Sequence, residues 1–234
     1  TEERRIGLSV KEDFSPRQPQ RDEGDARQQQ LFAEVDELLE LERFGPAREI
    51  INEQIDKTRD SILERWIEKL AESYVREENY QEAIEQYRVL IEEFPDRKQA
   101  QWLFNIADAY REDGEDDQAQ LILLRIRYRH RNSQIWPRAM RSLAEILTAD
   151  ENYDRARRIL EEIIEGQNRN RHPKTILTLA RLYDRQPVVR DYERAVEYYQ
   201  KAARLLEDDE PEDADQARSR ARYIIENYLQ FGTE

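Results

Sequence analysis

Alanine residues recur along this chain at a nearly constant spacing, and this feature limits its fold more than any other. Within each of two series, neighbouring alanines lie 36 to 39 residues apart. The series are Ala47, Ala83, Ala119, Ala156 and Ala195, and Ala71, Ala107, Ala144 and Ala180. Each alanine of the second series precedes one of the first by 12 residues, or by 15 in the last pair. Two small residues at that separation suit two antiparallel helices that cross closely, so the pattern predicts repeated helical hairpins.

The apolar residues around these alanines keep the period of an α-helix. Leu70 and Tyr74 share one helical face, and Ala83, Tyr87 and Leu90 share the next. Helix-breaking residues are expected between the helices, at Gly45–Pro46, Glu78–Asn79, Pro95–Asp96, Asp113–Gly114, Pro137, Asp150–Asn152, Gly166, His172–Pro173 and Gln186–Pro187. No stretch sustains the two-residue alternation of a β-strand, so we predict an all-α protein.

The segment from Glu64 to Pro95 resembles a tetratricopeptide repeat. Its pattern is formed by Ile67, Leu70–Ala71, Tyr74, Ala83, Tyr87, Leu90 and Pro95. Three similar copies follow and a degenerate copy precedes it, so the resemblance covers about residues 28–207. The last copy has three extra residues in its turn. It is similar to the SEL-like variety of the repeat, although it lacks the glycines expected in that turn.

The resemblance implies a right-handed α–α superhelix, a solenoid of about five helical hairpins. We assign residues 25–234 to this solenoid and residues 212–231 to a C-terminal capping helix that follows Pro211. Three arginines of the cap are expected to face water, and four apolar or aromatic residues are expected to cover the last repeat. These are Arg218, Arg220 and Arg222, and Tyr223, Ile224, Tyr228 and Leu229.

The composition agrees with a solenoid. Charged residues make up 38% of the 234 residues and hydrophobic residues only 38%, whereas ordinary globular domains have roughly 25% and 45–50%. A solenoid buries only the faces between neighbouring hairpins, so it has much surface for each residue. The surplus charge is therefore expected to cover that surface.

The sequence offers little for catalysis. It has no cysteine, which excludes zinc–thiolate sites, disulfides and cysteine nucleophiles. Its six glycines are never closer than 17 residues, so no phosphate-binding loop is formed, and its only histidines, His130 and His172, lie far apart. We therefore expect no enzyme activity and no cofactor or metal. The uncharged apolar runs are also far shorter than the roughly 20 residues of a membrane-spanning helix.

Residues 1–24 have the polar composition of a linker. Within them Ile6, Leu8, Val10 and Phe14 lie at nearly alternating positions, which suits an extended peptide in a groove. One hypothesis is that this tail docks on the solenoid or on a partner chain. The alternative, which the sequence leaves open, is that nothing holds it.

The resemblance also implies where a partner binds, because the first helix of each tetratricopeptide hairpin lines the concave surface. The inward positions outside the core carry nine basic and six acidic residues, whereas the whole chain has a net charge of −14. This reversal favours an acidic or carboxylate-ended peptide held by arginine forks. The candidate binding residues are Arg65, Lys69, Arg76, Phe104, Asn105, Arg111, Arg138, Arg141, Lys174, Arg181 and Arg185. The alternative is that these cations pair with glutamates of the stacked helices.

These observations predict a non-catalytic scaffold or adaptor in a multiprotein assembly, with the bacterial cell envelope as one setting. The alternative is a peptide receptor or chaperone-like module that binds acidic or C-terminal segments of client proteins. Nucleic acid is disfavoured by the net charge, although Arg125–Arg131 is a basic stretch. The lack of cysteine suits a periplasmic protein more than a cytoplasmic one, but a cytosolic chain can also lack it. Trp66, Trp102 and Trp136 are expected to belong to the core rather than to a binding surface.

Overall fold

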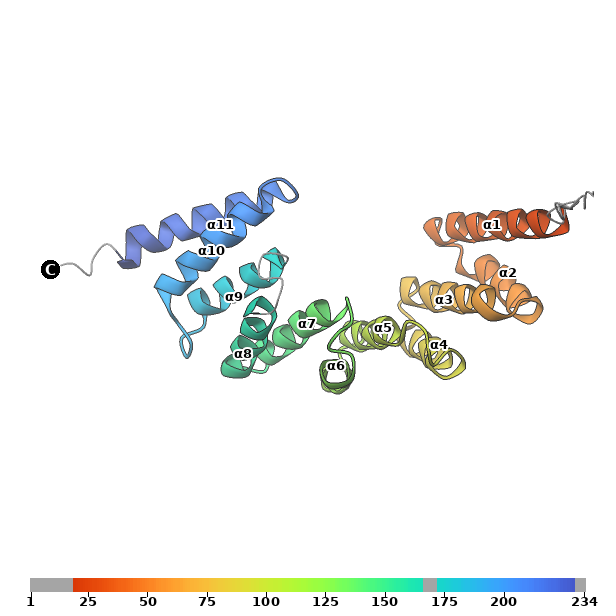
Figure 1. The fold of residues 1–234 in the computed structure, drawn as a ribbon, viewed down its shortest axis with the longest axis horizontal. Coiled ribbons are helices and arrows are strands. Elements are labelled where there is room, and N and C mark those ends of the chain that lie inside the picture. The colour runs from red at the N-terminus through yellow and green to blue at the C-terminus, as the bar shows by residue number, and fades with distance from the viewer. Residues whose placement is uncertain (1–18, 166–171, 230–234) are drawn as a thin grey trace, which may run out of the picture.

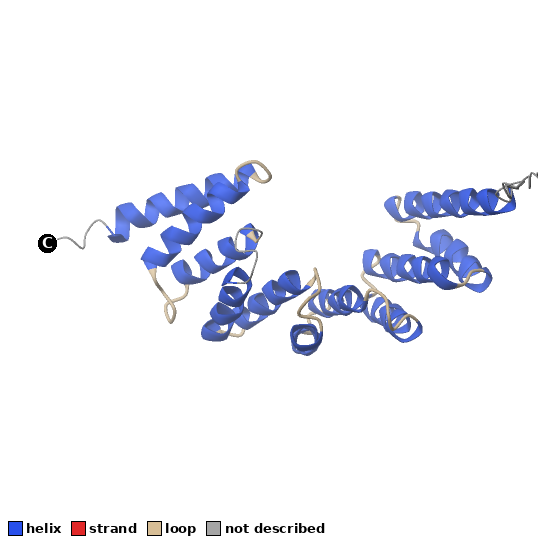
Figure 2. Ribbon diagram, in the orientation of Figure 1, coloured by secondary structure: helices blue, strands red, loops and turns tan. Residues whose placement is uncertain are grey.

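The computed structural model describes residues 19–165 and 172–229, and within these ranges it contains helices and no strand (Figure 2). The predicted all-α class is confirmed. The elements are α1 (Pro19–Glu40), α2 (Phe44–Lys57), α3 (Asp60–Arg76), α4 (Tyr80–Glu93), α5 (Gln99–Glu112), α6 (Asp116–Arg129), α7 (Trp136–Ala149), α8 (Tyr153–Glu165), α9 (Pro173–Arg185), α10 (Tyr192–Leu206), α11 (Pro211–Ile224) and the π-helical segment η1 (Ile225–Leu229).

The helices form an arc in which each one packs mainly on the helix before it and the helix after it. In Figure 1, α5 and α7 lie on the inner side of the arc, α4, α6 and α8 lie on its outer side, and α1 and α11 form the two tips. Five hairpins followed by one more helix make up the described chain. This arrangement confirms the predicted right-handed solenoid of stacked helical hairpins.

The alanines of the two series all belong to the buried core between neighbouring helices. All nine are completely shielded from solvent. A methyl group at a crossing lets two helix axes approach closely, and a longer side chain there would push them apart. The alanine spacing in the sequence is therefore the spacing of the helix–helix contacts in the fold.

The three tryptophans belong to the core, as predicted. Trp66 and Trp102 are fully buried and Trp136 is 7% exposed. Phe32 of α1 stacks on Trp66 of α3 with ring centroids 3.9 Å apart, so this pair joins the first two hairpins. The indole of Trp102 donates a hydrogen bond to Glu68 Oε1 at 2.8 Å. These rings therefore hold neighbouring hairpins together.

The first four hairpins share one kind of turn. The second residue after α1, α3, α5 and α7 has a left-handed backbone, with φ of 56° at Glu42, 61° at Glu78, 79° at Gly114 and 60° at Glu151. The next N–H bonds to the carbonyl five residues earlier, for example Asn79 N to Tyr74 O at 2.9 Å. This is the Schellman helix ending, which glycine adopts most easily. Of the four turns, only the one at Gly114 has a glycine at this position. The glutamates of the other three turns therefore adopt a conformation that costs energy.

Two details of the helix boundaries differ from the sequence-based expectation. Gly45–Pro46 and Pro137 lie in the first turns of α2 and α7, not between helices. Proline is accepted there because the first turn has no internal partner for its missing N–H group.

The ends of the chain are described in part. Helix α1 begins at Pro19, so the last six residues of the predicted 1–24 tail are helical. Ile6, Leu8, Val10 and Phe14 lie outside the described residues, and the docking of the tail stays a prediction.

At the C-terminal end, α11 and η1 together occupy residues 211–229, which include most of the predicted 212–231 cap. Ile224 is buried there, and Tyr228 stacks on Tyr192 of α10 at 4.4 Å.

Enlarging an alanine at a crossing tests its role in packing. We expect Ala144→Leu in α7 to lower the free energy of unfolding by about 1–3 kcal/mol, because the added atoms must displace packed neighbours. The control is Ala149→Leu, since Ala149 is exposed on the same helix. Urea unfolding followed by circular dichroism measures both, and equal stabilities would contradict the close crossing.

The left-handed turns allow a stabilising substitution. We expect Glu78→Gly to raise the free energy of unfolding by about 0.5–1 kcal/mol, because glycine adopts positive φ without a steric cost. The matched control is Glu85→Gly at an exposed position inside α4, which should be destabilising by about 1 kcal/mol. Thermal or urea unfolding distinguishes the two, and a loss of stability in both variants would refute the assignment of the turn.

Candidate partner-binding surface

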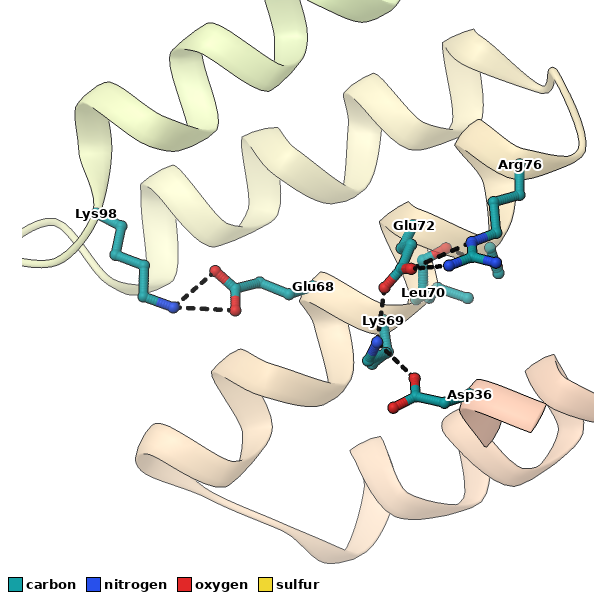
Figure 3. A network of polar contacts seen from close by, with 8 residues as sticks. Asp36, Glu68, Lys69, Leu70, Glu72, Arg76 and Lys98 are labelled. Carbon is teal, nitrogen blue, oxygen red and sulfur yellow. Dashed lines mark hydrogen bonds and ion pairs between the residues drawn. The ribbon is translucent and has the colours of Figure 1, made fainter. Parts of the chain in front are cut away.

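First helices of successive hairpins are bridged by ion pairs at the N-terminal end of the arc. Lys69 Nζ of α3 lies 2.6 Å from Asp36 Oδ1 of α1, and it also pairs with Glu72 at 2.7 Å. Lys98, which precedes α5, lies 3.0 Å from Glu68 of α3. Figure 3 shows these contacts as two neighbouring groups, one of Asp36, Lys69, Glu72 and Arg76 across α1 and α3, and one of Glu68 and Lys98 between α3 and the start of α5.

The middle of the arc is bridged in the same way. Arg111 of α5 lies 3.3 Å from Glu145 of α7 and donates a hydrogen bond of 2.6 Å to Ser142 Oγ. In the opposite direction, Arg138 of α7 lies 3.6 Å from Asp108 of α5. The charges of α5 and α7 therefore largely neutralise each other.

The C-terminal end has the most buried pair. The guanidinium of Arg220 in α11 donates two hydrogen bonds, of 2.7 and 2.9 Å, to the carboxylate of Asp184 in α9. The Asp184 side chain is fully buried and also accepts a bond from the Tyr199 hydroxyl at 3.1 Å. The expectation that Arg220 faces water was wrong, because a buried carboxylate needs a cationic partner. Lys174 of α9 adds a surface pair with Glu210 at 2.8 Å.

The predicted binding residues are therefore used in different ways. Five of the nine cations form ion pairs, namely Lys69, Arg76, Arg111, Arg138 and Lys174. Arg65 instead lies over the ring of Phe32, 4.0 Å from its centroid. Phe104 is 2% exposed and lies beneath the guanidinium of Arg138, which is 4.5 Å from its centroid. Asn105 accepts a hydrogen bond of 2.8 Å from Gln101.

The series of bridges is interrupted between α7 and α9. In the described part of the chain, Arg141, Arg181 and Arg185 make no ion pair with a carboxylate. Arg181 and Arg185 are exposed, and Arg141 is half-buried. The pKa of His172, at the start of α9, is lowered by partial burial and by the positive charge of Arg141. Positive charge thus remains uncompensated where α7 faces α9.

A cavity of about 380 Å³ lies at this interruption. Its α7 wall contains Glu145, Thr148 and Ala149, and its α9 wall contains Leu182 between Arg181 and Arg185. The hydroxyl of Thr148 donates to Ala144 O within its own helix, at 2.7 Å. The site combines apolar side chains with two guanidinium groups and one carboxylate, Glu145, which already pairs with Arg111. The excess of positive charge suits a carboxylate on an otherwise apolar chain.

A second cavity, of about 450 Å³, lies between α3 and α5 and has the opposite charge. Asp108 and Glu112 of α5 line it together with Tyr80 and Tyr87 of α4. Burial raises the pKa of Tyr87 to about 12, with further contributions from Glu72, Glu68 and Asp108. Burial also raises the pKa of Asp108, while Arg138 and Arg111 lower it in part and Glu112 and Glu145 raise it further. The lining of this cavity contains no cation.

The basic stretch on the outer side is partly neutralised. Arg127 and Arg131 both pair with Glu162 of α8, each at 2.9 Å. The pKa of His130 is lowered by partial burial and by Arg125 and Arg129. Two of the five positively charged or titratable side chains of this stretch thus serve to join α6 to α8.

The described residues contain no cluster of histidine and carboxylate side chains that could hold a metal ion. Over the same ranges, no helix has both the length and the apolar character needed to span a bilayer.

Two segments of the chain match family models described as tetratricopeptide repeat. One match covers residues 74–143 and the other covers residues 175–213. These two segments are therefore tetratricopeptide repeats, as the residue pattern indicated, and this repeat is a protein-interaction fold. The second match includes the longer turn that is similar to the SEL-like variety. A search of curated proteins finds no match.

Solved structures of tetratricopeptide-repeat proteins share the fold at low sequence identity. PilF from Pseudomonas aeruginosa is 16% identical with a TM-score of 0.58, and the match covers 90% of this chain and 94% of PilF. MamA is 17% identical with a TM-score of 0.55, over 74% of this chain and 94% of MamA. YrrB, a tetratricopeptide-repeat protein with an unusual peptide-binding site, is 16% identical with a TM-score of 0.52, over 79% and 88%.

Sequence reasoning missed two partners of the inner cations. Asp36 belongs to α1 and Glu210 precedes α11, and neither lies in the first helices of the four repeats from which the inward positions were taken. The repeat spacing could have identified Asp36 and Glu210, because a charge on one first helix faces the corresponding positions one repeat away.

Removing the cation from the buried pair should be costly. We expect Arg220→Met to lower the free energy of unfolding by about 3 kcal/mol, because Asp184 would remain buried without a counter-charge. Arg222→Met is the control, since Arg222 is exposed on the same helix and should change stability by less than about 0.5 kcal/mol. Urea unfolding measures both, and similar values would show that the pair contributes nothing.

Proposed function

We propose that this protein is a non-catalytic interaction module that binds an extended segment of a partner protein on its inner surface. Such binding would serve a scaffold or adaptor in a multiprotein assembly, and equally a receptor for transient clients. The repeat fold supports interaction over catalysis, because it offers a long, rigid and concave surface. The similarity in fold to YrrB, whose structure has a peptide-binding site, is consistent with a peptide as the bound form.

One observation carries this proposal: the ion-pair series is interrupted at a cavity. Along the rest of the inner surface, the candidate cations other than Arg65 already have carboxylate partners, so a bound anion would have to displace them, and Arg65 lies over the ring of Phe32. Between α7 and α9, Arg181 and Arg185 have no such partner within the described residues and line an open cavity. A guanidinium binds a carboxylate through two parallel hydrogen bonds, each roughly twice as strong as a neutral one. We therefore assign an acidic side chain or a C-terminal carboxylate to this site.

Reversing the charges of this site tests the proposal. The triple variant Arg141→Glu, Arg181→Glu and Arg185→Glu should lose the partners that the wild-type protein captures from a native lysate, because each contact becomes repulsive. The control is the triple variant Arg125→Glu, Arg129→Glu and Arg155→Glu, which makes the same change of charge at exposed positions on the outer helices α6 and α8.

Quantitative mass spectrometry of both pull-downs provides the measurement. The outer variant should retain the partners, and circular dichroism should show that both variants keep their helical content. Partners that stay bound to the inner variant would defeat the proposal. Partners or RNA lost only from the outer variant would instead place binding on the outer basic stretch.

A further inference from the structure

The two cavities of the inner surface carry opposite charges and lie on either side of a neutral region. One lies between α3 and α5 and is lined by Asp108 and Glu112 without a cation. The other lies between α7 and α9 and is lined by Arg181 and Arg185 together with one carboxylate, Glu145. Glu112, Arg181 and Arg185 are the charges of these linings that form no ion pair within the described residues. Between the two cavities, α5 and α7 are joined by the pairs of Arg111 with Glu145 and of Arg138 with Asp108. The inner surface is thus acidic at one place and basic at another.

The acidic cavity suits a cationic side chain. Glu112 is exposed and, in the described residues, forms no ion pair, so its carboxylate is available to a ligand. Tyr80 and Tyr87 provide aromatic walls from α4. The pKa of Tyr80 is raised by partial burial and by Glu78, Glu112 and Asp113, which reports the negative potential there. Carboxylates beside tyrosine rings attract a lysine or arginine by charge and by cation–π contact.

The neutral region between the cavities is expected to add little to the affinity for a charged segment. Its cations and carboxylates already satisfy each other, so a bound chain gains little from adding one charge opposite them. Discrimination among partner segments must then come mainly from the two ends, where charge is left unmatched. An occupant with a single kind of charge would be attracted at one cavity and repelled at the other.

We propose that the inner surface binds an extended partner segment that contains both acidic and basic residues. A carboxylate of this segment binds at the α7–α9 cavity, and a lysine or arginine side chain binds at the α3–α5 cavity. This inference rests on the proposed function and adds the second charge and its position. The α7–α9 cavity takes the carboxylate because its guanidinium groups are exposed, and the α3–α5 cavity takes the cation because its lining is acidic.

The repeat also gives the separation of the two charges. The cavities are two helical hairpins apart, and even directly packed helices lie about 10 Å from each other, so the distance is at least about 20 Å. An extended chain advances about 3.3 Å for each residue, so at least about six residues span it. The partner segment should therefore carry its acidic and basic residues at least about six positions apart.

A displayed library of random dodecapeptides tests this with the full chain. Wild-type protein should enrich peptides with one acidic and one basic residue at that spacing. For an enriched peptide made synthetically, Glu112→Arg and Arg181→Glu should each weaken binding about tenfold or more, as expected for the loss of one charge-assisted contact. The matched controls are Glu92→Arg and Arg155→Glu, at exposed positions of the outer helices α4 and α8.

A charge exchange shows that the effect is specific. Changing the basic residue of the peptide to glutamate should restore its binding to Glu112→Arg and weaken its binding to the wild-type protein. A variant that had merely lost its fold would not gain affinity for the altered peptide. Failure of this rescue, with Glu112→Arg still weakened, would overturn the placement of the cation.

The remaining outcomes separate this inference from the proposed function. Enrichment of acidic peptides that depend on Arg181 and ignore Glu112 would overturn the inference and leave the proposed function standing. Enrichment that ignores Arg181 and Arg185, or no enrichment, would overturn both. A synthetic peptide of residues 1–18 serves as a competitor, and complete displacement by it would assign the surface to the tail of this chain and overturn a partner segment as the occupant.

Discussion

The close crossing of helices at buried alanines is the contact on which the rest of this structure depends. In the last four hairpins a buried alanine of the first helix is followed by a buried alanine of the second helix after 12 or 15 residues, and side chains this small let two helix axes approach closely. The first hairpin keeps only Ala47 of this pair. Hairpins of equal shape stack into a regular arc, and every first helix comes to lie beside the first helix of the next hairpin.

That regular stacking determines the electrostatics of the inner surface. Corresponding positions on successive first helices face one another, so Asp36 meets Lys69 and Asp108 meets Arg138. Each pair is partly exposed and contributes little stability alone. Together the pairs have another effect, because they remove most of the inner cations from competition for a ligand. Binding capacity is then restricted to the places where the series is interrupted.

The fold was predictable from the sequence because its decisive residues are local and repeated. Nine alanines, the helical period around them and the turn residues indicate the hairpins without knowledge of any distant contact. The binding surface was predictable only in outline. Whether Arg138 meets Asp108 or a ligand depends on the side-chain direction and the offset between two hairpins, which no spacing in the sequence reports. Arg220 was misplaced for the same reason, because its partner Asp184 lies 36 residues earlier on another helix.

The separation between packing and charge suggests how such a surface acquires specificity. In a solenoid each hairpin contacts only its neighbours, so an exposed inner residue can change while the alanine crossings that hold the stack are retained. A change such as the loss of one carboxylate would release its cation and open a new binding position one repeat away. The charges that a partner must carry therefore depend on which inner residues lack an ion-pair partner. The distance between those charges is determined by the size of the repeat. For this chain the pattern that we propose consists of the interruption at α7–α9 and the acidic lining at α3–α5.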